Sequence, residues 1–322
     1  MRLSSATKFT TLADYVYQAI EKNLHKTLQW EKSVKKDEDP EALHQMRVGM
    51  RRLRTAIGGF NSHLNLPKSV SDKNIGKITK ILGNLRDLDV LKEILENNYQ
   101  PHLLAEEKDD LQIVFSHLAK QRQIALINVH KLFKDDIYKS FKYSLEKWLE
   151  TPIYQPSAAL GINQVLPDLL LPEICKFLLH PAWMFGTEID DSAVINTTDW
   201  TPEELEKNLQ QYGENLHDLR KQAKRVRYQM ELFTDLYDET FTVHISHVKN
   251  IQGMLGQIQD SMVLNQWLTN IFHSKTEEKL SGLNTLLAAN RYQLWQQWQP
   301  MKLQYLSLEN KRSLHLTILQ NL

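Results

Sequence analysis

The segment Glu41–Arg54 constrains the fold most, because only a helix sorts its side chains by chemistry. At about 100° per residue an apolar stripe forms on one side: Leu43, Met46, Met50, Leu53, Ile57 and Phe60. Within an arc of about 80° beside it lies a first basic row: His44, Arg47, Arg51 and Arg54. Like charges on one face repel, and Glu41 is the one carboxylate in the segment. The segment therefore predicts a core-packed helix with an anion-binding face.

The same arrangement recurs at an offset of 173 residues, from Leu216 to Tyr228. His44, Arg47, Arg51, Arg52 and Arg54 correspond in order to His217, Arg220, Lys224, Arg225 and Arg227. At the same offset, Leu82, Gly83 and Asp87 correspond to Leu255, Gly256 and Asp260. Between Leu43–Val90 and Leu216–Val263, 12 of 48 positions are identical. We interpret this as an internal duplication of a long unit, with a second basic row: His217, Arg220, Lys224 and Arg227.

Both copies resemble the pattern of the CHAD domain family, the conserved histidine α-helical domain. The family pattern is His-x-x-Arg-x-x-x-Arg/Lys-Arg-x-Arg, followed by Leu-Gly-x-x-x-Asp, in each of two related halves. The resemblance runs from about residue 10 to about residue 300 of this chain. It implies an all-α fold of two pseudo-symmetric antiparallel helical bundles, with a basic groove or pore between them that binds inorganic polyphosphate.

The composition is that of an ordinary globular chain of 322 residues, with 39 basic and 39 acidic residues. This balance argues against a protein that coats nucleic acid by bulk basicity. Cys175 is the only cysteine, so disulfides within the chain and cysteine-based zinc sites are excluded. Residues 1–8 lack the apolar core of a signal peptide, and prolines and charges interrupt the most apolar region, Leu169–Phe185. We expect a cytoplasmic protein, located at polyphosphate granules if it binds that polymer.

Helical periodicity and start signals predict the elements. Asp39-Pro40 and Thr201-Pro202-Glu203-Glu204 are helix N-termini. Helices are expected over 12–36, from 40, over 71–97, over 102–149 as one or two, from 202, over 243–271 and over 276–297. No segment shows a bounded two-residue alternation, so strands are not expected.

Three parts of the chain are predicted. Residues 1–150 form the first helical half of the domain, and residues 201–322 form the second. Residues 151–200 hold five of the ten prolines yet stay apolar. They are therefore expected to be an ordered connector with short helices, because flexible linkers are polar.

Each candidate site residue has a competing structural reading. The basic rows could be solvated faces with internal salt bridges. Two copies in one register favour an anion site, because arginine presents a planar fork to phosphate oxygens. His44 and His217 could be hydrogen-bonded core histidines, and we expect them to donate to phosphate. A metal is disfavoured there, since a metal site requires carboxylates or further histidines. Arg52, Lys221, Arg225 and Tyr228 complete the candidate set of the two helices.

The later helix of each half supplies further candidates. Gly83 and Gly256 are expected to let the basic helix come near, and Asp87 and Asp260 to hold one of its cations, although simple packing is the alternative. Lys73, Lys77 and Lys80 share a face with Asp87 and would widen the site. Their counterparts are Ser246, Asn250 and Gly253, so the predicted site is asymmetric.

The predicted function is non-catalytic binding of inorganic polyphosphate or a similar linear polyanion. Phosphate-binding loops, dinucleotide fingerprints and His-Glu-x-x-His zinc motifs are absent from the sequence, and no cofactor is expected. One alternative is a metal-dependent polyphosphate or nucleotide hydrolase that uses His44, His217, Asp87 and Asp260. The other is a granule scaffold that binds protein or nucleic acid. The bound chain length and the oligomeric state stay open.

Overall fold

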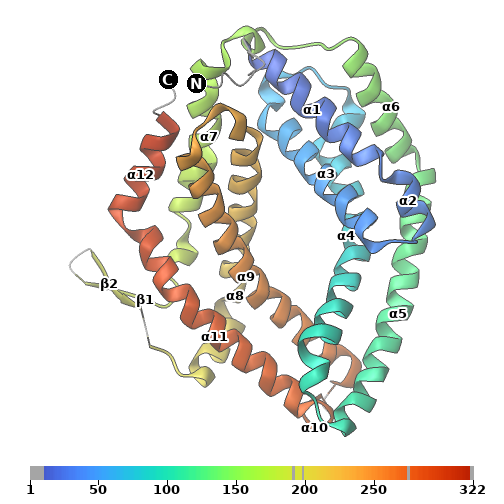
Figure 1. Ribbon diagram of the computed structural model, residues 1–322, viewed down its shortest axis with the longest axis vertical. Helices are drawn as coiled ribbons and strands as arrows, with labels where there is room; N and C mark the ends of the chain where they lie inside the picture. Colours follow the sequence, from blue (N-terminus) through green and yellow to red (C-terminus); the bar gives the residue numbers. More distant parts are fainter. Residues whose placement is uncertain (1–10, 191–192, 198, 274–275, 320–322) are drawn as a thin grey trace, which may run out of the picture. The chain divides into compact units, whose positions relative to one another are not determined.

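The computed structural model describes residues 11–190, 193–197, 199–273 and 276–319, and helices dominate this part of the chain (Figure 1). It forms two compact units. Of the described residues, the first unit holds those up to Asp87 together with Arg122–Leu169. The second holds Leu88–Gln121 and those from Leu170 onward. The predicted all-α class is confirmed, whereas the duplication and the three predicted parts stay predictions.

The first unit is built on helices near the N-terminus of the chain. Its elements are α1 (Leu12–Leu28), α2 (Glu31–Lys36), α3 (Pro40–Gly59), η1 (Asn61–His63), η2 (Lys68–Val70), α6 (Asp136–Glu150) and η5 (Pro156–Ala159). The unit boundary falls within three longer helices: α4 (Asp72–Ile94), α5 (Ala105–Lys134) and α7 (Ile162–Leu178).

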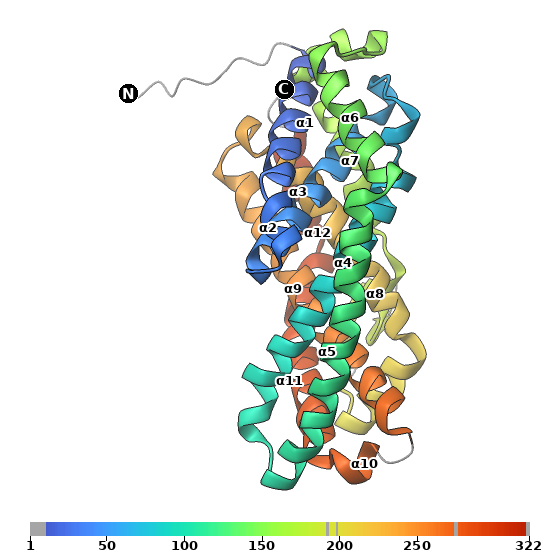
Figure 2. The ribbon, with the colours of Figure 1, turned by 90° about the vertical axis from the view of Figure 1, so that its right-hand side faces the viewer.

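The second unit contains the remaining elements. They are η3 (Leu95–Tyr99, a π-helical turn), η4 (Gln100–His102), η6 (Pro181–Met184), β1 (Thr187–Asp190), β2 (Ala193–Thr197), α8 (Pro202–Leu232), η7 (Thr234–Leu236), α9 (Glu239–Phe272), α10 (Thr276–Lys279), α11 (Ser281–Leu306) and α12 (Leu308–Leu319). Figure 2 shows the same elements turned by 90° about the vertical axis.

The predicted helix starts are confirmed by their capping geometry. The Asp39 carboxylate accepts the backbone N–H of Glu41 at 2.8 Å, and Pro40 occupies the first turn of α3. Thr201 and Glu204 form a reciprocal capping box at the start of α8. Each cap satisfies backbone donors that have no partner within the helix. The two helices that carry the basic rows therefore begin where the sequence directs.

Three details of the predicted secondary structure are wrong. The expected helix over 12–36 is interrupted between Leu28 and Glu31. The connector contains α7, a 17-residue helix, despite its two internal prolines. The helix forms because its apolar side chains Leu166, Leu170, Ile174 and Phe177 are almost fully buried. The free energy gained by this burial outweighs a cost of about 3 kcal/mol per interior proline. An antiparallel hairpin of β1 and β2 adds the strands that the sequence did not predict.

The core of the first unit is formed where α1 packs against α3 (Figure 1, blue). The α3 side chains Leu43, Met46, Met50, Leu53 and Ile57 are buried, as the apolar stripe predicts. On α1, Val16, Ile20 and Leu24 are buried. A Cβ added to Gly49 would lie 2.6 Å from Thr27 Oγ1 and 3.1 Å from the Thr27 backbone. The two helices therefore cross closely at Gly49 and Thr27.

Aromatic rings and one buried amine organise the second unit near its hairpin. Trp183 stacks on Trp298 and on Tyr305, and all three side chains are buried. Lys302 is fully buried, and its Nζ donates to the carbonyl oxygens of Phe185 and Gly186 at 2.8 Å each. Burial lowers the pKa of Lys302 to about 7. The amine thus fixes the backbone immediately before β1.

We expect Gly49→Ala to destabilise the protein by about 1–3 kcal/mol, because the new methyl group meets the Thr27 backbone. Gly253→Ala is the matched control. Gly253 lies inside α9 with nothing within 4 Å of an added Cβ, so this change should stabilise the helix by about 0.5–1 kcal/mol. Urea unfolding measures both variants. A Gly49→Ala variant as stable as the wild type would contradict the close crossing.

Candidate functional site

The first basic row is held by contacts from α4 in the same unit. Arg47 Nη1 donates to the carbonyl oxygen of Gly83 at 3.0 Å and to Asp87 Oδ1 at 2.9 Å. The Arg47 side chain is 15% exposed, whereas that of Asp87 is 72% exposed. The guanidinium lies over Gly83, where an added Cβ would be 3.6 Å from Nη2. Gly83 thus admits the arginine side chain, and Asp87 orients it.

Arg54 is clamped in a similar way at the other end of the row. Its Nε and Nη2 donate to the two carboxylate oxygens of Asp72 at 2.7 and 2.9 Å. This two-pronged bond raises the pKa of Arg54, and burial opposes the rise. The guanidinium also lies against Gly76, 3.4 Å from an added Cβ. Arg54 and Arg47 are therefore fixed in direction, each over a glycine of α4.

His44 lies among the cations of the first unit and is half-buried. Burial is the largest cause that lowers its pKa. Glu41 opposes this shift, and Arg86, Arg51 and Arg47 reinforce it. Arg86, on α4 beside Asp87, was not predicted as a site residue. Its helical spacing from Gly83 was the available signal, because residues three apart share one face of a helix.

The second basic row has the corresponding contacts within the second unit, between α8 and α9. Arg220 Nη2 lies 3.3 Å from Asp260 Oδ1, with side chains 17% and 42% exposed. An added Cβ on Gly256 would lie 3.2 Å from Arg220 Nε. Arg220, Gly256 and Asp260 thus repeat the contact of Arg47, Gly83 and Asp87. In both units the aspartate forms an ion pair with the arginine, which is the contact that a cation-holding role requires.

His217 is half-buried on α8. Burial lowers its pKa most, and Lys221, Arg220 and Lys224 add to the effect. Glu214 opposes it. Lys221 itself forms an exposed ion pair with Asp218 at 2.9 Å. The hydrogen bond from Lys221 is the main cause that lowers the pKa of Asp218, and the charge of His180 lowers it further.

The remaining predicted residues of α8 do not all share one face. Arg227 lies 3.6 Å from Glu231 and 4.5 Å from the Tyr228 ring, and Tyr228 is buried. Lys224 is half-buried, as is Arg51 at the corresponding position on α3. Arg225 lies toward α7, 3.5 Å from the Gln222 side chain, whose amide donates to Glu173. Arg225 is therefore on the flank of α8, away from the row.

The same holds for Arg52 in the first unit. Its charge contributes to lowering the pKa of Lys26 on α1, after burial and Lys22. Arg52 thus lies on the α1 side of α3. Lys73, Lys77 and Lys80 are exposed on α4. In the described part of the chain, none of these three lysines has a carboxylate within 4 Å, since the ion pairs found there involve other residues.

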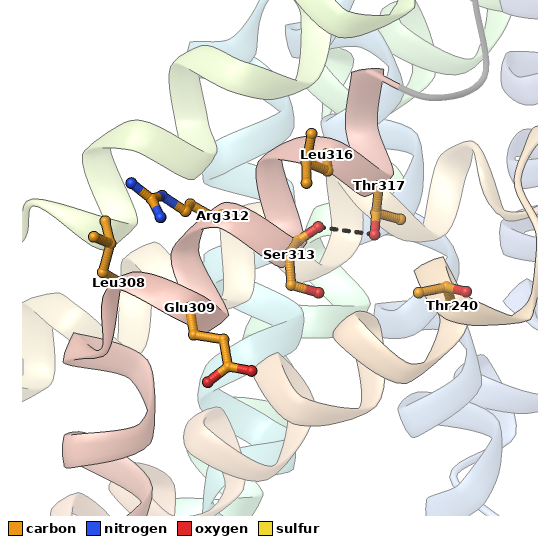
Figure 3. Close-up of a pocket in the computed structure, with 7 residues that line it drawn as sticks. All are labelled: Thr240, Leu308, Glu309, Arg312, Ser313, Leu316 and Thr317. Atoms are coloured by element: carbon orange, nitrogen blue, oxygen red, sulfur yellow. Dashed lines mark hydrogen bonds between the residues drawn. The ribbon is translucent and has the colours of Figure 1, made fainter.

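The chemistry available at the two rows is anion binding. No group of three His, Cys, Asp or Glu side chains within the described residues could hold a metal ion. No helix in the same part of the chain is long and apolar enough to cross a membrane. A pocket at α12 lies elsewhere, and Figure 3 shows Arg312 and Ser313 among its seven lining residues. None of the seven is a predicted site residue.

Comparisons with known proteins agree with this fold. The family model of the CHAD domain matches residues 18–269. No curated protein matches the chain. A crystal structure of the CHAD domain from the plant Ricinus communis is similar, with a TM-score of 0.62 and 20% identity over 99% of this chain and 94% of that one. PptA from Streptomyces chartreusis gives a TM-score of 0.65 and 13% identity over 92% of this chain and 99% of that one.

In the free protein, we expect His44 and His217 to titrate below about 6.5, the ordinary imidazole pKa. A lowered folded-state pKa means that the unfolded chain binds protons first as the pH falls. The free energy of unfolding should therefore fall below about pH 6.5, and His44→Gln should reduce that slope. Nuclear magnetic resonance titration and urea unfolding at several pH values measure this. A titration above 6.5 for both imidazoles would refute the assigned surroundings.

Proposed function

The chain belongs to the CHAD domain family, and from that premise we propose that it binds inorganic polyphosphate, without catalysis, through its two basic rows. One repeated contact supports the proposal most. In each unit an arginine of the basic helix lies over a glycine of the next helix and is held by an aspartate one turn beyond, as in Arg47 with Asp87 and Arg220 with Asp260. Core packing alone does not require a charged side chain at this position.

The spacing of the rows suits a linear polyanion. Successive row positions are three or four residues apart on a helix that rises about 1.5 Å per residue, so cations repeat roughly every turn. Within the described residues, the buried Nε atoms of Arg47 and Arg220 have no hydrogen-bond acceptor. Half-buried cations interact more strongly with an anion than exposed ones do, because the surroundings screen them less. A chain of phosphates offers an acceptor to each cation in turn.

Phosphate also explains the histidine environment. His44 and His217 each lie among three cations that disfavour protonation. An anion at the row reverses that balance, since it stabilises an imidazolium that can donate from both ring nitrogens. The predicted groove or pore between the halves stays a prediction, because each row is described within its own unit.

A metal-dependent hydrolase remains the rival function, and the donor chemistry disfavours it. Asp87 and Asp260 would have to supply the carboxylates, yet each is bonded to an arginine. The charged groups that shift the pKa values of His44 and His217 are cations, apart from Glu41 and Glu214. A cation brought in by the phosphate chain would escape this repulsion, so the two functions differ in their response to chelation.

We expect Arg51→Glu and Lys224→Glu each to weaken polyphosphate binding by roughly tenfold or more, because each replaces an attraction with a repulsion at a half-buried position. Isothermal titration calorimetry with long-chain polyphosphate, at low and at physiological salt, measures the affinity. Lys147→Glu is the control, since Lys147 is an exposed lysine of α6 with the same change in charge.

The pattern of these variants also tests whether both rows act. Loss from Arg51→Glu with none from Lys224→Glu would restrict the site to the first unit. Equal small losses in all three variants would reduce the effect to net charge and overturn the proposal. Circular dichroism confirms that each variant is folded.

We expect binding to tighten as the pH falls from about 8 to about 6, because bound phosphate raises the lowered pKa values of His44 and His217. The double variant His44→Gln, His217→Gln should lose this pH dependence while still binding through the arginines. EDTA should have no effect.

A metal-dependent enzyme requires the opposite response, since protonated imidazole cannot bind a metal. Binding that weakens at low pH and is abolished by EDTA would replace the proposal with the hydrolase. Shortening of the polymer in the presence of magnesium, followed on a gel, would do the same.

A further inference from the structure

Helix α12 carries apolar side chains on both of its sides. Its inner side is packed within the second unit, where Leu314 and Ile318 are buried and the Ile318 carbonyl oxygen accepts a hydrogen bond from the Tyr237 hydroxyl at 3.2 Å. On its outer side, Leu308 and Leu316 are 62% and 54% exposed. A helix that packs on one side normally presents polar residues to solvent on the other. Packing within the described residues therefore does not account for the two outer leucines.

The outer side of α12 forms the pocket of Figure 3, whose volume is about 630 Å³. Two neighbouring rows of side chains line it, each with residues four positions apart, and Thr240 of α9 completes it. The first row is Leu308, Arg312 and Leu316, and the second is Glu309, Ser313 and Thr317. Within the described residues neither Arg312 nor Glu309 forms an ion pair, since the pairs found in the second unit involve other residues. The pocket thus offers a cation, an anion and two leucines to a partner.

The first row of the pocket reads the same in both directions along the helix. Leucine, arginine and leucine follow one another at four-residue spacing, so each leucine lies about 6 Å along the axis from Arg312. When a second copy of α12 lies antiparallel, with a two-fold axis at Arg312, Leu308 of each copy meets Leu316 of the other. A symmetric contact between identical chains requires this kind of self-complementary surface.

The charges of the pocket fit the same arrangement. The two-fold axis brings the two Arg312 side chains near each other, and they repel. Glu309 lies one turn from Arg312 on the neighbouring row, so Glu309 of each copy comes within reach of Arg312 of the other. Two arginines and two glutamates then form a neutral group. A partner of unrelated sequence would have to supply both charges and both leucines at this spacing, whereas α12 already carries them.

We propose that the pocket at α12 is a self-association surface, in which the α12 helices of two copies of this chain pack antiparallel and form the Leu308–Leu316 and Glu309–Arg312 contacts twice. The inference does not depend on polyphosphate binding. A helix of 12 residues offers less surface than the roughly 800 Å² per partner of a standard interface. The dimer is therefore weak, and we expect a Kd on the order of 10–100 µM.

Charge reversal tests the arrangement most directly. Glu309→Arg and Arg312→Glu each place like charges opposite one another at two symmetric contacts, so each should weaken the dimer by about tenfold. An equal mixture of the two variants regains opposite charges at every contact. Native mass spectrometry of the mixture should therefore show the heterodimer in excess over both homodimers. Sedimentation velocity between about 5 and 500 µM measures the Kd of the wild type and of each variant.

Two leucine variants test the apolar contacts. Leu316→Gln should also weaken the dimer by about tenfold, because each substitution counts twice in a symmetric interface. Leu179→Gln is the matched control, since Leu179 is 80% exposed at the end of α7 and should leave the dimer unchanged. Circular dichroism confirms that every variant is folded.

Several outcomes would overturn the proposal. A wild type that stays monomeric up to about 500 µM would assign the pocket to a different partner. A dimer that persists in Glu309→Arg, Arg312→Glu and Leu316→Gln would place the contact on another face. Equal weakening by Leu179→Gln and Leu316→Gln would reduce the effect to general hydrophobicity. A mixture without excess heterodimer would refute the antiparallel pairing of the two helices.

Discussion

Repulsion between like charges on one face of a helix is the constraint on which the rest of this structure depends. The row on α3 brings four basic residues together next to a buried stripe. Within α3 itself, Glu41 is the only acidic residue that can offset their charge. The next helix supplies the compensation, through Asp72 on Arg54 and Asp87 on Arg47. Glycines of α4 make room for the two guanidinium groups. The fold of this region is thus organised to keep cations in fixed positions, at a stability cost that small residues and acids reduce.

The sequence predicts those features that depend on local chemistry. The caps at Asp39 and Thr201 follow from side chains that reach their own backbone, so they need no knowledge of tertiary contacts. The apolar stripe of α3 follows from periodicity. In contrast, α7 contradicts its local proline content, because the burial of four apolar side chains decides the outcome. The hairpin of β1 and β2 escaped prediction for a similar reason, since its anchor is Lys302, more than a hundred residues later in the chain.

The same limit applies to the candidate site, where spacing along a helix is informative and tertiary packing is not visible in the sequence. Spacing correctly put Asp87 and Asp260 near the cations, since two helices that meet at a glycine bring the next turn into reach. Spacing puts Arg52 and Arg225 outside the rows, but it could not show what each side chain faces, because that depends on which neighbour each helix packs against. Arg86 was not predicted, because its counterpart in the second half is Gln259 and the duplicated pattern therefore does not include it.

The aspartates that hold the arginines have a consequence for selectivity. Asp72 accepts hydrogen bonds from Nε and Nη2 of Arg54, and Asp87 accepts one from Nη1 of Arg47. The protein therefore contains carboxylates that compete with an external anion for these donors. If the rows bind anions as proposed, a single phosphate from solution must compete with a carboxylate that is always present. A polymer differs, because once one unit is bound the next is held at a high effective concentration near its neighbour. If the rows bind polyanions as proposed, these internal carboxylates act as a filter that discriminates against cellular monophosphates and favours multivalent chains.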